Sequence, residues 1–241
     1  MRKIFVLLCF VILYPVLSYS QTKIDPAEIT SAVPELSKFH EIIYPMWHDA
    51  YPAKNYSALK SYVPQIKESV ESINKAKLPG ILRDKEDGWK NQLDELNMSA
   101  QNYYNAVNNN DNDALLSAAE RLHASYEKLN RVIRPAIKEI DDYHQTLYII
   151  YHKFYPDAKF DEIAKLTGDL EAKAGAVANY PKDRLRQRLG DNVTKYDNAA
   201  KQLLIATNNL KEALNGYDLK KKKEAVESLH KAYLDLDSVF N

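Results

Sequence analysis

Six histidines are the residues of this chain best suited to metal chemistry. They form three pairs with similar sequence surroundings, and the pairs are His40 with His144, His48 with His152, and His123 with His230. Neutral imidazole is the commonest metal ligand in proteins. A carboxylate precedes each member of the last pair by three residues, at Glu120 and Glu227. Two histidines and a carboxylate suit Zn²⁺, Cu²⁺, Ni²⁺ or Fe, so we expect one metal site in each half of the chain.

Tyrosines accompany these histidines in a repeated pattern. The frame H-x3-Y-x3-H-x2-Y-P runs from His40 to Pro52 and again from His144 to Pro156. A shorter frame, E-x2-H-x2-Y, contains both the carboxylate and the third histidine of each half. Buried tyrosines usually anchor their hydroxyl to a polar neighbour. We therefore expect the repeated tyrosines to pack around the metal ligands, and they are Tyr44, Tyr51, Tyr126, Tyr148, Tyr155 and Tyr233.

Two other interpretations of the histidines stay open. The first is a structural or protein-interaction module, in which histidines at the edge of a core only tie helices together. A repeated polar pair would then persist because an unpartnered buried group costs about 1–3 kcal/mol. The second is an enzyme with a redox or hydrolytic metal site. The chain contains no G-x-S-x-G motif and no phosphate-cradling glycine loop, so no catalytic residue is predicted.

The histidine pairs reflect a likeness between the two halves of the chain. Three segments align with one another, and they are 35–56 with 139–160, 89–107 with 196–214, and 118–133 with 225–240. The last two alignments share one shift, which is three positions larger than the shift of the first. A repeat of this length that occurs twice indicates a tandem duplication. We predict a leader at 21–33 and repeats at 34–136 and 138–241.

Each predicted repeat contains four helical segments. In the first repeat, apolar residues recur every three or four positions over about 35–50, 56–75, 86–108 and 113–133. Short polar connections favour antiparallel neighbours, so we predict an all-α protein of two tandem up-down-up-down four-helix bundles. Pro64 and Gly168 occupy equivalent positions in the second helix, and both weaken a helix interior, so we expect a bend at each.

Helix geometry selects which histidines meet. In an antiparallel bundle the first and fourth helices are neighbours, which brings His48 level with His123 and close to Glu120. His40 is about 12 Å along the helix axis from His48, so it completes the site or supports it from outside. The second repeat would place its own residues in the same way, and they are His144, His152, His230 and Glu227.

The chain begins with a predicted signal peptide at residues 1–20. Arg2 and Lys3 precede an apolar run, and Ser18-Tyr19-Ser20 resembles a cleavage site. The apolar run is too short and interrupted for a membrane span. We therefore expect an exported protein, periplasmic or secreted, with no membrane span after cleavage. The single cysteine, Cys9, lies in this segment, so the mature chain has no disulfide, no thiolate metal site and no covalent haem attachment.

The charge of the mature chain excludes two classes of partner. Removal of the signal peptide leaves 31 basic and 33 acidic residues, and this near balance argues against binding to nucleic acid or to an anionic membrane. The expected partners are a metal ion and an exported protein partner.

The predicted architecture resembles the cytochrome b562 family, and more loosely the cytochrome c′ family. The resemblance covers the exported four-helix bundle and the histidine of the last helix, His123 or His230. It implies a non-covalently bound haem, whose iron in that family is held by a methionine of the first helix and this histidine. Met46 matches that methionine, whereas Ile150 stands at its place in the second repeat. The covalent haem motif of the c′ type is absent.

Overall fold

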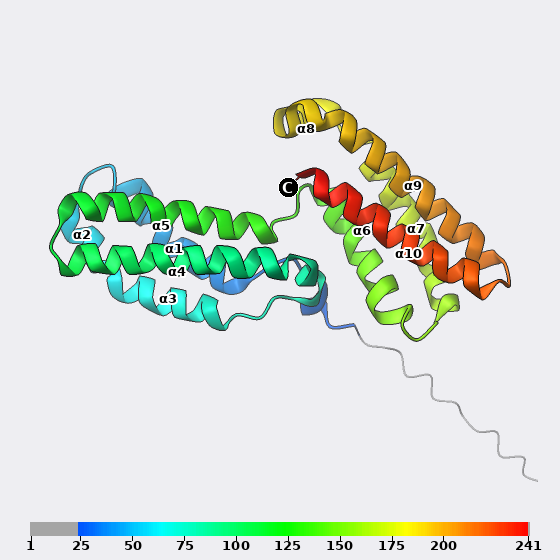
Figure 1. Ribbon diagram of the computed structural model, residues 1–241, viewed down its shortest axis with the longest axis horizontal. Coiled ribbons are helices and arrows are strands. Elements are labelled where there is room, and N and C mark those ends of the chain that lie inside the picture. The colour runs from blue at the N-terminus through cyan, green and yellow to red at the C-terminus, as the bar shows by residue number, and fades with distance from the viewer. Residues whose placement is uncertain (1–23, 241) are drawn as a thin grey trace, which may run out of the picture.

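The computed structural model of the protein describes residues 24–240. In this part of the chain all regular structure is helical and no β-strand occurs, which confirms the predicted all-α class (Figure 1). None of the helices in this range combines the length and the apolar character needed to cross a membrane. The predicted signal peptide, with Cys9, lies outside the described residues.

A first group of helices covers the chain from Pro26 to Ile133. It consists of the 3₁₀-helix η1 (Pro26–Ile29), α1 (Pro34–Pro45), the π-helix η2 (Met46–Ala50), α2 (Tyr56–Ser61), α3 (Val63–Lys75), the 3₁₀-helix η3 (Gly80–Lys85), α4 (Glu86–Asn108) and α5 (Asn112–Ile133). The predicted helices at 86–108 and 113–133 are confirmed by α4 and α5, and α5 begins at a side-chain cap from Asp111 to the Ala114 amide.

A second group covers the chain from Lys138 to Phe240. It consists of α6 (Lys138–Ile149), the π-helix η4 (Ile150–Phe154), α7 (Phe160–Ala178), α8 (Lys182–Leu189), the 3₁₀-helix η5 (Gly190–Asn192), α9 (Val193–Asn215), α10 (Leu219–Asp237) and the 3₁₀-helix η6 (Ser238–Phe240). The short helix α8 lies between the aligned segments 139–160 and 196–214, where the alignment of the two halves gains three residues and the sequence indicates only a loop.

Element boundaries recur at the shifts seen in the sequence. Helix α6 and the π-helix after it begin and end at the smaller shift from α1 and its own π-helix. Helix α9 begins and ends at the larger shift from α4. Lys54 and Ala158, which are equivalent at the smaller shift, both adopt a positive φ after the π-helix.

The two predicted bends have different outcomes. Helix α2 ends at Ser61 and α3 begins at Val63, with Pro64 in its first turn, where the missing proline N–H costs no hydrogen bond. At Gly168 the helix is not interrupted, because α7 runs from Phe160 to Ala178, and the bend there stays a prediction. Glycine keeps its backbone N–H, so it weakens a helix without interrupting the hydrogen bonds.

The helices enclose two hydrophobic cores. In the first group α1 packs on α3, α3 on α4, α4 on α5, and η2 on α5. In the second group α6 packs on α7, α7 on α9, α9 on α10, and α10 on α6. Fully buried side chains such as Phe39 and Leu122 fill one core, and Tyr143 and Leu229 fill the other.

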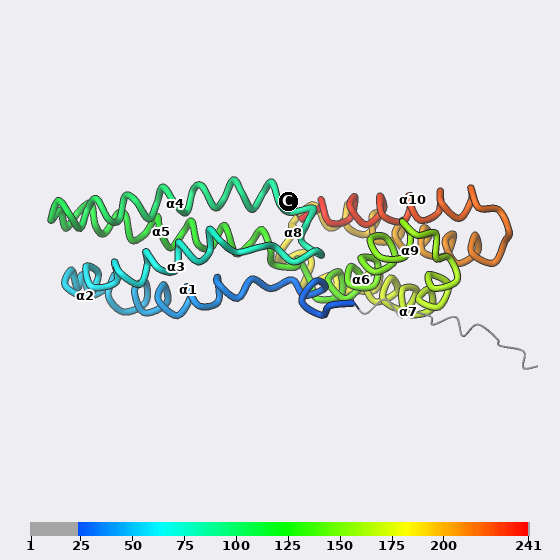
Figure 2. The backbone as a smooth tube through the Cα atoms, turned by 90° about the horizontal axis from the view of Figure 1, so that it is seen from below, coloured from blue at the N-terminus to red at the C-terminus, as the bar shows by residue number. Residues whose placement is uncertain are grey.

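The two groups lie end to end, and the C-terminus of the chain is at their junction (Figures 1 and 2). Tyr148 of α6 is only 1% exposed and belongs to the core of the first group. Its hydroxyl accepts a hydrogen bond from Arg83 Nη2 at 2.8 Å and donates one to Glu28 Oε2 at 3.1 Å. A Cβ added to Gly80 would lie 2.1 Å from this hydroxyl, so the close approach requires glycine.

The described part of the predicted leader, 24–33, lies at this junction. Its helix η1 packs against η3, and Glu28 forms an ion pair with Lys153 of η4 at 2.5 Å. Ser31 donates a hydrogen bond to Asp141 of α6. The leader therefore joins the two groups of helices and does not lie on the first group alone.

Candidate metal centre

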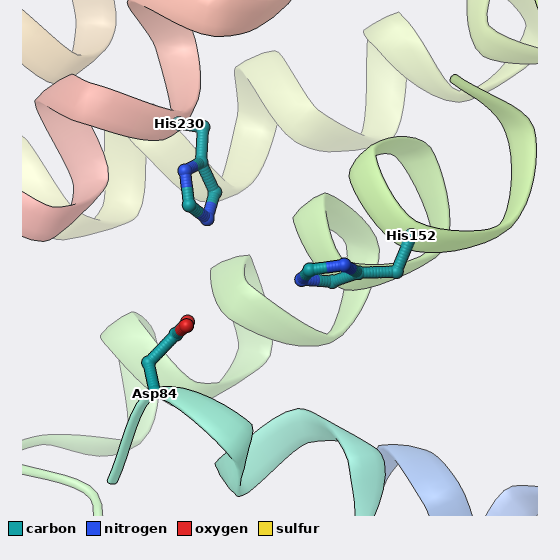
Figure 3. A group of neighbouring side chains, drawn as sticks. All are labelled: Asp84, His152 and His230. Atoms are coloured by element: carbon teal, nitrogen blue, oxygen red, sulfur yellow. The ribbon is translucent and has the colours of Figure 1, made fainter. Parts of the chain in front are cut away.

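Three potential metal ligands converge at the junction. Asp84 of η3, His152 of η4 and His230 of α10 each offer a ligand atom, and these atoms lie within 4.8 Å of one another. Figure 3 shows the three side chains pointing into a common space from three separate elements. Among residues 24–240 this is the one group of three or more such side chains close enough to share an ion.

Local structure places each ligand. His152 lies on the π-helix, in which the Tyr155 amide bonds the Ile150 carbonyl at 2.8 Å. This wider turn is a feature often found at functional sites. The ring of His230 stacks on Tyr151 with centroids 3.8 Å apart and planes 5° apart. Asp84 reaches the site from the other group of helices, on the segment that packs against Tyr148.

The surroundings keep both imidazoles neutral. Burial, and then the nearby Arg83 guanidinium, lower the pKa of His152 to about 4, although the Asp84 carboxylate opposes this shift. Burial also lowers the pKa of His230, against the opposing charges of Asp84 and Glu227. Metal ligation requires unprotonated imidazole, so at neutral pH both rings are in the form that can bind a cation.

One ring nitrogen of the site lacks a partner. His230 Nε2 is buried, and no group in the described part of the chain is placed to hydrogen-bond it. A buried polar atom left in this state typically costs about 1–3 kcal/mol. An ion placed among the three side chains would supply the missing interaction.

Arg83 holds the other histidine in a defined way. Arg83 Nη1 lies 3.1 Å from His152 Nδ1. A guanidinium group can only donate, so Nδ1 accepts and the proton of the neutral ring lies on Nε2. Binding an ion through Nε2 therefore requires that this proton leaves and that Arg83 moves away from a newly protonated Nδ1.

The remaining predicted residues of the second group lie around the centre. His144 is 8% exposed and stacks on Tyr233 at 4.3 Å, and burial lowers its pKa to about 3. Glu227 accepts a hydrogen bond from Tyr151 at 3.0 Å and is not part of the converging group. Tyr155 stacks on Tyr151 at 5.6 Å. The structure thus brings together His152 and His230 of the predicted set, with Asp84 in addition.

The first group places its predicted residues differently. Their rings contact one another along α1, η2 and α5. Three pairs are stacked, Tyr126 with His40 at 5.8 Å, Trp47 with Tyr51 at 4.4 Å and Trp47 with His123 at 4.3 Å, and Tyr44 lies tilted against His48 at 4.5 Å. Burial lowers the pKa of His123, and the charges of His48 and His40 add to this shift. Glu120 is exposed, and Met46, the methionine implied by the cytochrome resemblance, is fully buried in the core.

Sequence reasoning missed Asp84. It lies outside the aligned segments, in what was treated as a connection between helices. A signal was present, because Asp191 follows Asp84 at the same shift that relates the adjoining segments. Extending that alignment by five residues before Trp89 would have paired the two aspartates.

Comparison of the chain with protein-family models, with curated proteins and with solved structures finds no match.

Proposed function

We propose that the protein binds a divalent transition-metal ion at Asp84, His152 and His230, and that it senses, buffers or delivers this ion outside the cytoplasm. The scaffold in this proposal is a tandem duplication of an up-down-up-down four-helix bundle. Helix boundaries that recur at the two shifts of the sequence alignment support the duplication.

The observation that carries the proposal is the unpartnered Nε2 of His230. It lies in a group of three side chains whose ligand atoms are within 4.8 Å of one another. Both imidazoles are neutral at pH 7, and the carboxylate adds a negative charge for the cation. This donor set suits Zn²⁺, Cu²⁺, Ni²⁺ or Fe²⁺.

The exposure of the centre favours an exchangeable ion. Asp84 is exposed, and the two histidines are half-buried. Three protein ligands leave one position of a tetrahedral Zn²⁺ open to water or to a donor from another molecule. Such an open position suits uptake and transfer better than permanent structural binding.

A second candidate function, a helical interaction module, is supported by a different set of contacts. His144 stacks on Tyr233, and His123 stacks on Trp47 with planes 5° apart. In these two pairs the histidine ring packs against an aromatic ring of another helix. The module would then use His40, His48, His123 and His144 only to hold the helices together.

The test compares a carboxylate that is a proposed metal ligand with a carboxylate that is not. Asp84→Asn should weaken Zn²⁺ binding at least about tenfold, because a ligand charge is lost. Glu227→Gln is the matched control, since Glu227 is also exposed but bonds Tyr151. It removes a nearby charge but no proposed ligand, so it should weaken binding much less than Asp84→Asn in an equilibrium titration of the purified protein.

Thermal melting gives an independent readout of the same site. Zn²⁺ at a hundred times its Kd stabilises a folded protein by about 2.7 kcal/mol, which raises Tm by about 5–10 °C for a chain of this size. His230→Ala should abolish that rise. A melting curve of the wild type that is identical with Zn²⁺, Cu²⁺, Ni²⁺ and chelator would reject metal binding in favour of the interaction module.

A further inference from the structure

Equivalent faces of the two helix groups differ sharply in exposure. Tyr148 is 1% exposed, whereas Tyr44, its counterpart in the first group, is 53% exposed. His144 is 8% exposed and therefore buried, whereas its counterpart His40 is exposed. The first group therefore presents to solvent a face of aromatic and imidazole rings that the second group buries.

The second group buries this face under a segment of the first group. Helix η3 packs against α6, with Arg83 on Tyr148 and His152, and with Asp84 beside His230. Lys85 of the same segment forms an ion pair with Asp237 of α10. The contact thus joins η3 to the rings of α6, the π-helix and α10.

The first group has a groove at the position equivalent to the Lys85–Asp237 ion pair of the second group. Asn130 occupies the position equivalent to Asp237 at the larger shift of the alignment. It lines a groove between α1 and α5 together with His40, Leu36, Tyr126 and Ile133. His40 and Tyr126 are the counterparts of His144 and Tyr233, which lie near the charges of Lys85 and Asp84 of η3 in the second group.

The chain carries a second segment that matches η3. Residues 189–192 are equivalent to 82–85 at the larger shift, and each segment leads directly into a long helix, α9 or α4. Asp191 and Asn192 take the places of Asp84 and Lys85, and both are exposed. Gly190 adopts a φ of 52°, which favours glycine and sets the turn that presents Asp191.

One polar pair that would meet is complementary, whereas Gly190 takes the place of Arg83 and brings no counterpart of its hydrogen bonds to the rings. In the internal contact a lysine faces an aspartate, Lys85 and Asp237. In the equivalent positions of the uncovered face both residues are asparagine, at 192 and 130. Each primary amide can both donate and accept a hydrogen bond. A neutral hydrogen-bonding pair therefore takes the place of the Lys–Asp pair, and neither position is left with an unpaired charge.

We propose that the uncovered face of the first group binds the segment Leu189–Asn192 of a second copy of this chain, and that Asp191 of that copy completes a second metal site with His48 and His123. The metal part of this inference rests on the proposed function, and the protein contact does not. The two surfaces are different, so each copy has one segment and one face to offer, and the copies either pair reciprocally in a closed assembly or continue from copy to copy.

Sedimentation velocity over a wide range of protein concentration tests the contact. In the wild type the average sedimentation coefficient should rise with concentration, also with chelator present. Asn130→Asp combined with Asn192→Asp should weaken the association at least about tenfold, because two like charges would face each other.

A matched double variant separates this effect from damage to the fold. Asn130→Asp combined with Asn192→Lys differs from the first variant at one position and recreates the internal Lys–Asp pair. It should associate at least as strongly as the wild type. Equal behaviour of the two double variants, or a wild type that stays monomeric at every concentration, would overturn the inference.

Zinc stoichiometry distinguishes the two metal sites. Dilute protein should bind one Zn²⁺ per chain, and associated protein should bind two. Asp84→Asn should weaken the binding of the ion in dilute protein, whereas Asp191→Asn should weaken only the binding of the one gained on association. If dilute protein binds Zn²⁺ and Asp191→Asn does not change the Zn²⁺ stoichiometry of associated protein, only the second metal site is rejected. If Zn²⁺ binds at neither concentration, the proposed function fails, and the double variants still decide the contact.

Discussion

At the scale of single residues, the candidate centre depends on what each imidazole nitrogen faces. His230 offers an unpartnered nitrogen, whereas His152 has one nitrogen occupied by Arg83. A histidine that ligates a metal normally donates its other N–H to an acceptor. Arg83 cannot accept, and its positive charge repels a cation, so it would oppose the metal binding that we propose at this site.

Replacement of Arg83 should therefore tighten metal binding. Arg83→Gln removes the charge and offers an amide oxygen to a protonated Nδ1, and we expect the Kd for Zn²⁺ to fall by about tenfold, or about 1.4 kcal/mol. Arg83→Lys is the control, because lysine keeps the charge and also lacks an acceptor. Isothermal titration of both variants would count against this role of Arg83 if they bound Zn²⁺ equally.

His144 makes the stability of the protein depend on pH. Its pKa is lowered to about 3 by burial, so the unfolded chain takes up a proton near pH 6.5 that the folded chain refuses. The free energy of unfolding should therefore decrease as the pH falls, with a slope that approaches about 1.4 kcal/mol for each pH unit, or by about 1.6 kcal/mol in all between pH 6.5 and 5.

His144→Phe keeps an aromatic ring against Tyr233 and removes the titrating group. Urea unfolding of this variant at pH 6.5 and pH 5 should show a smaller loss of stability than the wild type. The remaining loss would come from His152, His230 and His123, whose pKa values are lowered in the same direction. Parallel pH profiles for the two proteins would show that His144 does not control this dependence.

At the scale of elements, the sequence was informative where local signals decide structure. The boundaries of α4 and α5 could be predicted because apolar spacing and polar connections mark both ends. The π-helices could not, since Met46–Ala50 and Ile150–Phe154 show the same apolar spacing as an ordinary α-helix. The proximity of His152 to His230 could be predicted because their helices were expected to be neighbours. The place of Asp84 in the site could not, because it depends on a contact between the two helix groups, and spacing within one half of the sequence does not indicate such a contact.

The contact between η3 and α6 depends on a glycine. Gly80→Ala would place a Cβ against the buried hydroxyl of Tyr148, and shifting that ring should lower the free energy of unfolding by about 1–3 kcal/mol. Gly175→Ala is the matched control inside α7, where a new Cβ meets nothing within 4 Å. It should raise stability by about 0.5–1 kcal/mol. Chemical unfolding of the two variants in parallel would contradict this account if both were stabilised.

At the scale of the whole molecule, similar halves have unequal surroundings. The ring-bearing face of the second group is covered by η3, and the same face of the first group is open. Sequence comparison of the halves predicted equal sites because it registers residue types and not their neighbours. The difference arises because η3 covers the rings of the second group, whereas no described segment of the same chain covers those of the first.

The insertion of Tyr148 into the core of the neighbouring helix group has a further consequence. A side chain that is 1% exposed there cannot remain in place when either group melts. Loss of one group would uncover the aromatic ring and leave Arg83 and Glu28 without their shared phenol. We therefore expect the melting of one group to destabilise the other, although each has its own core.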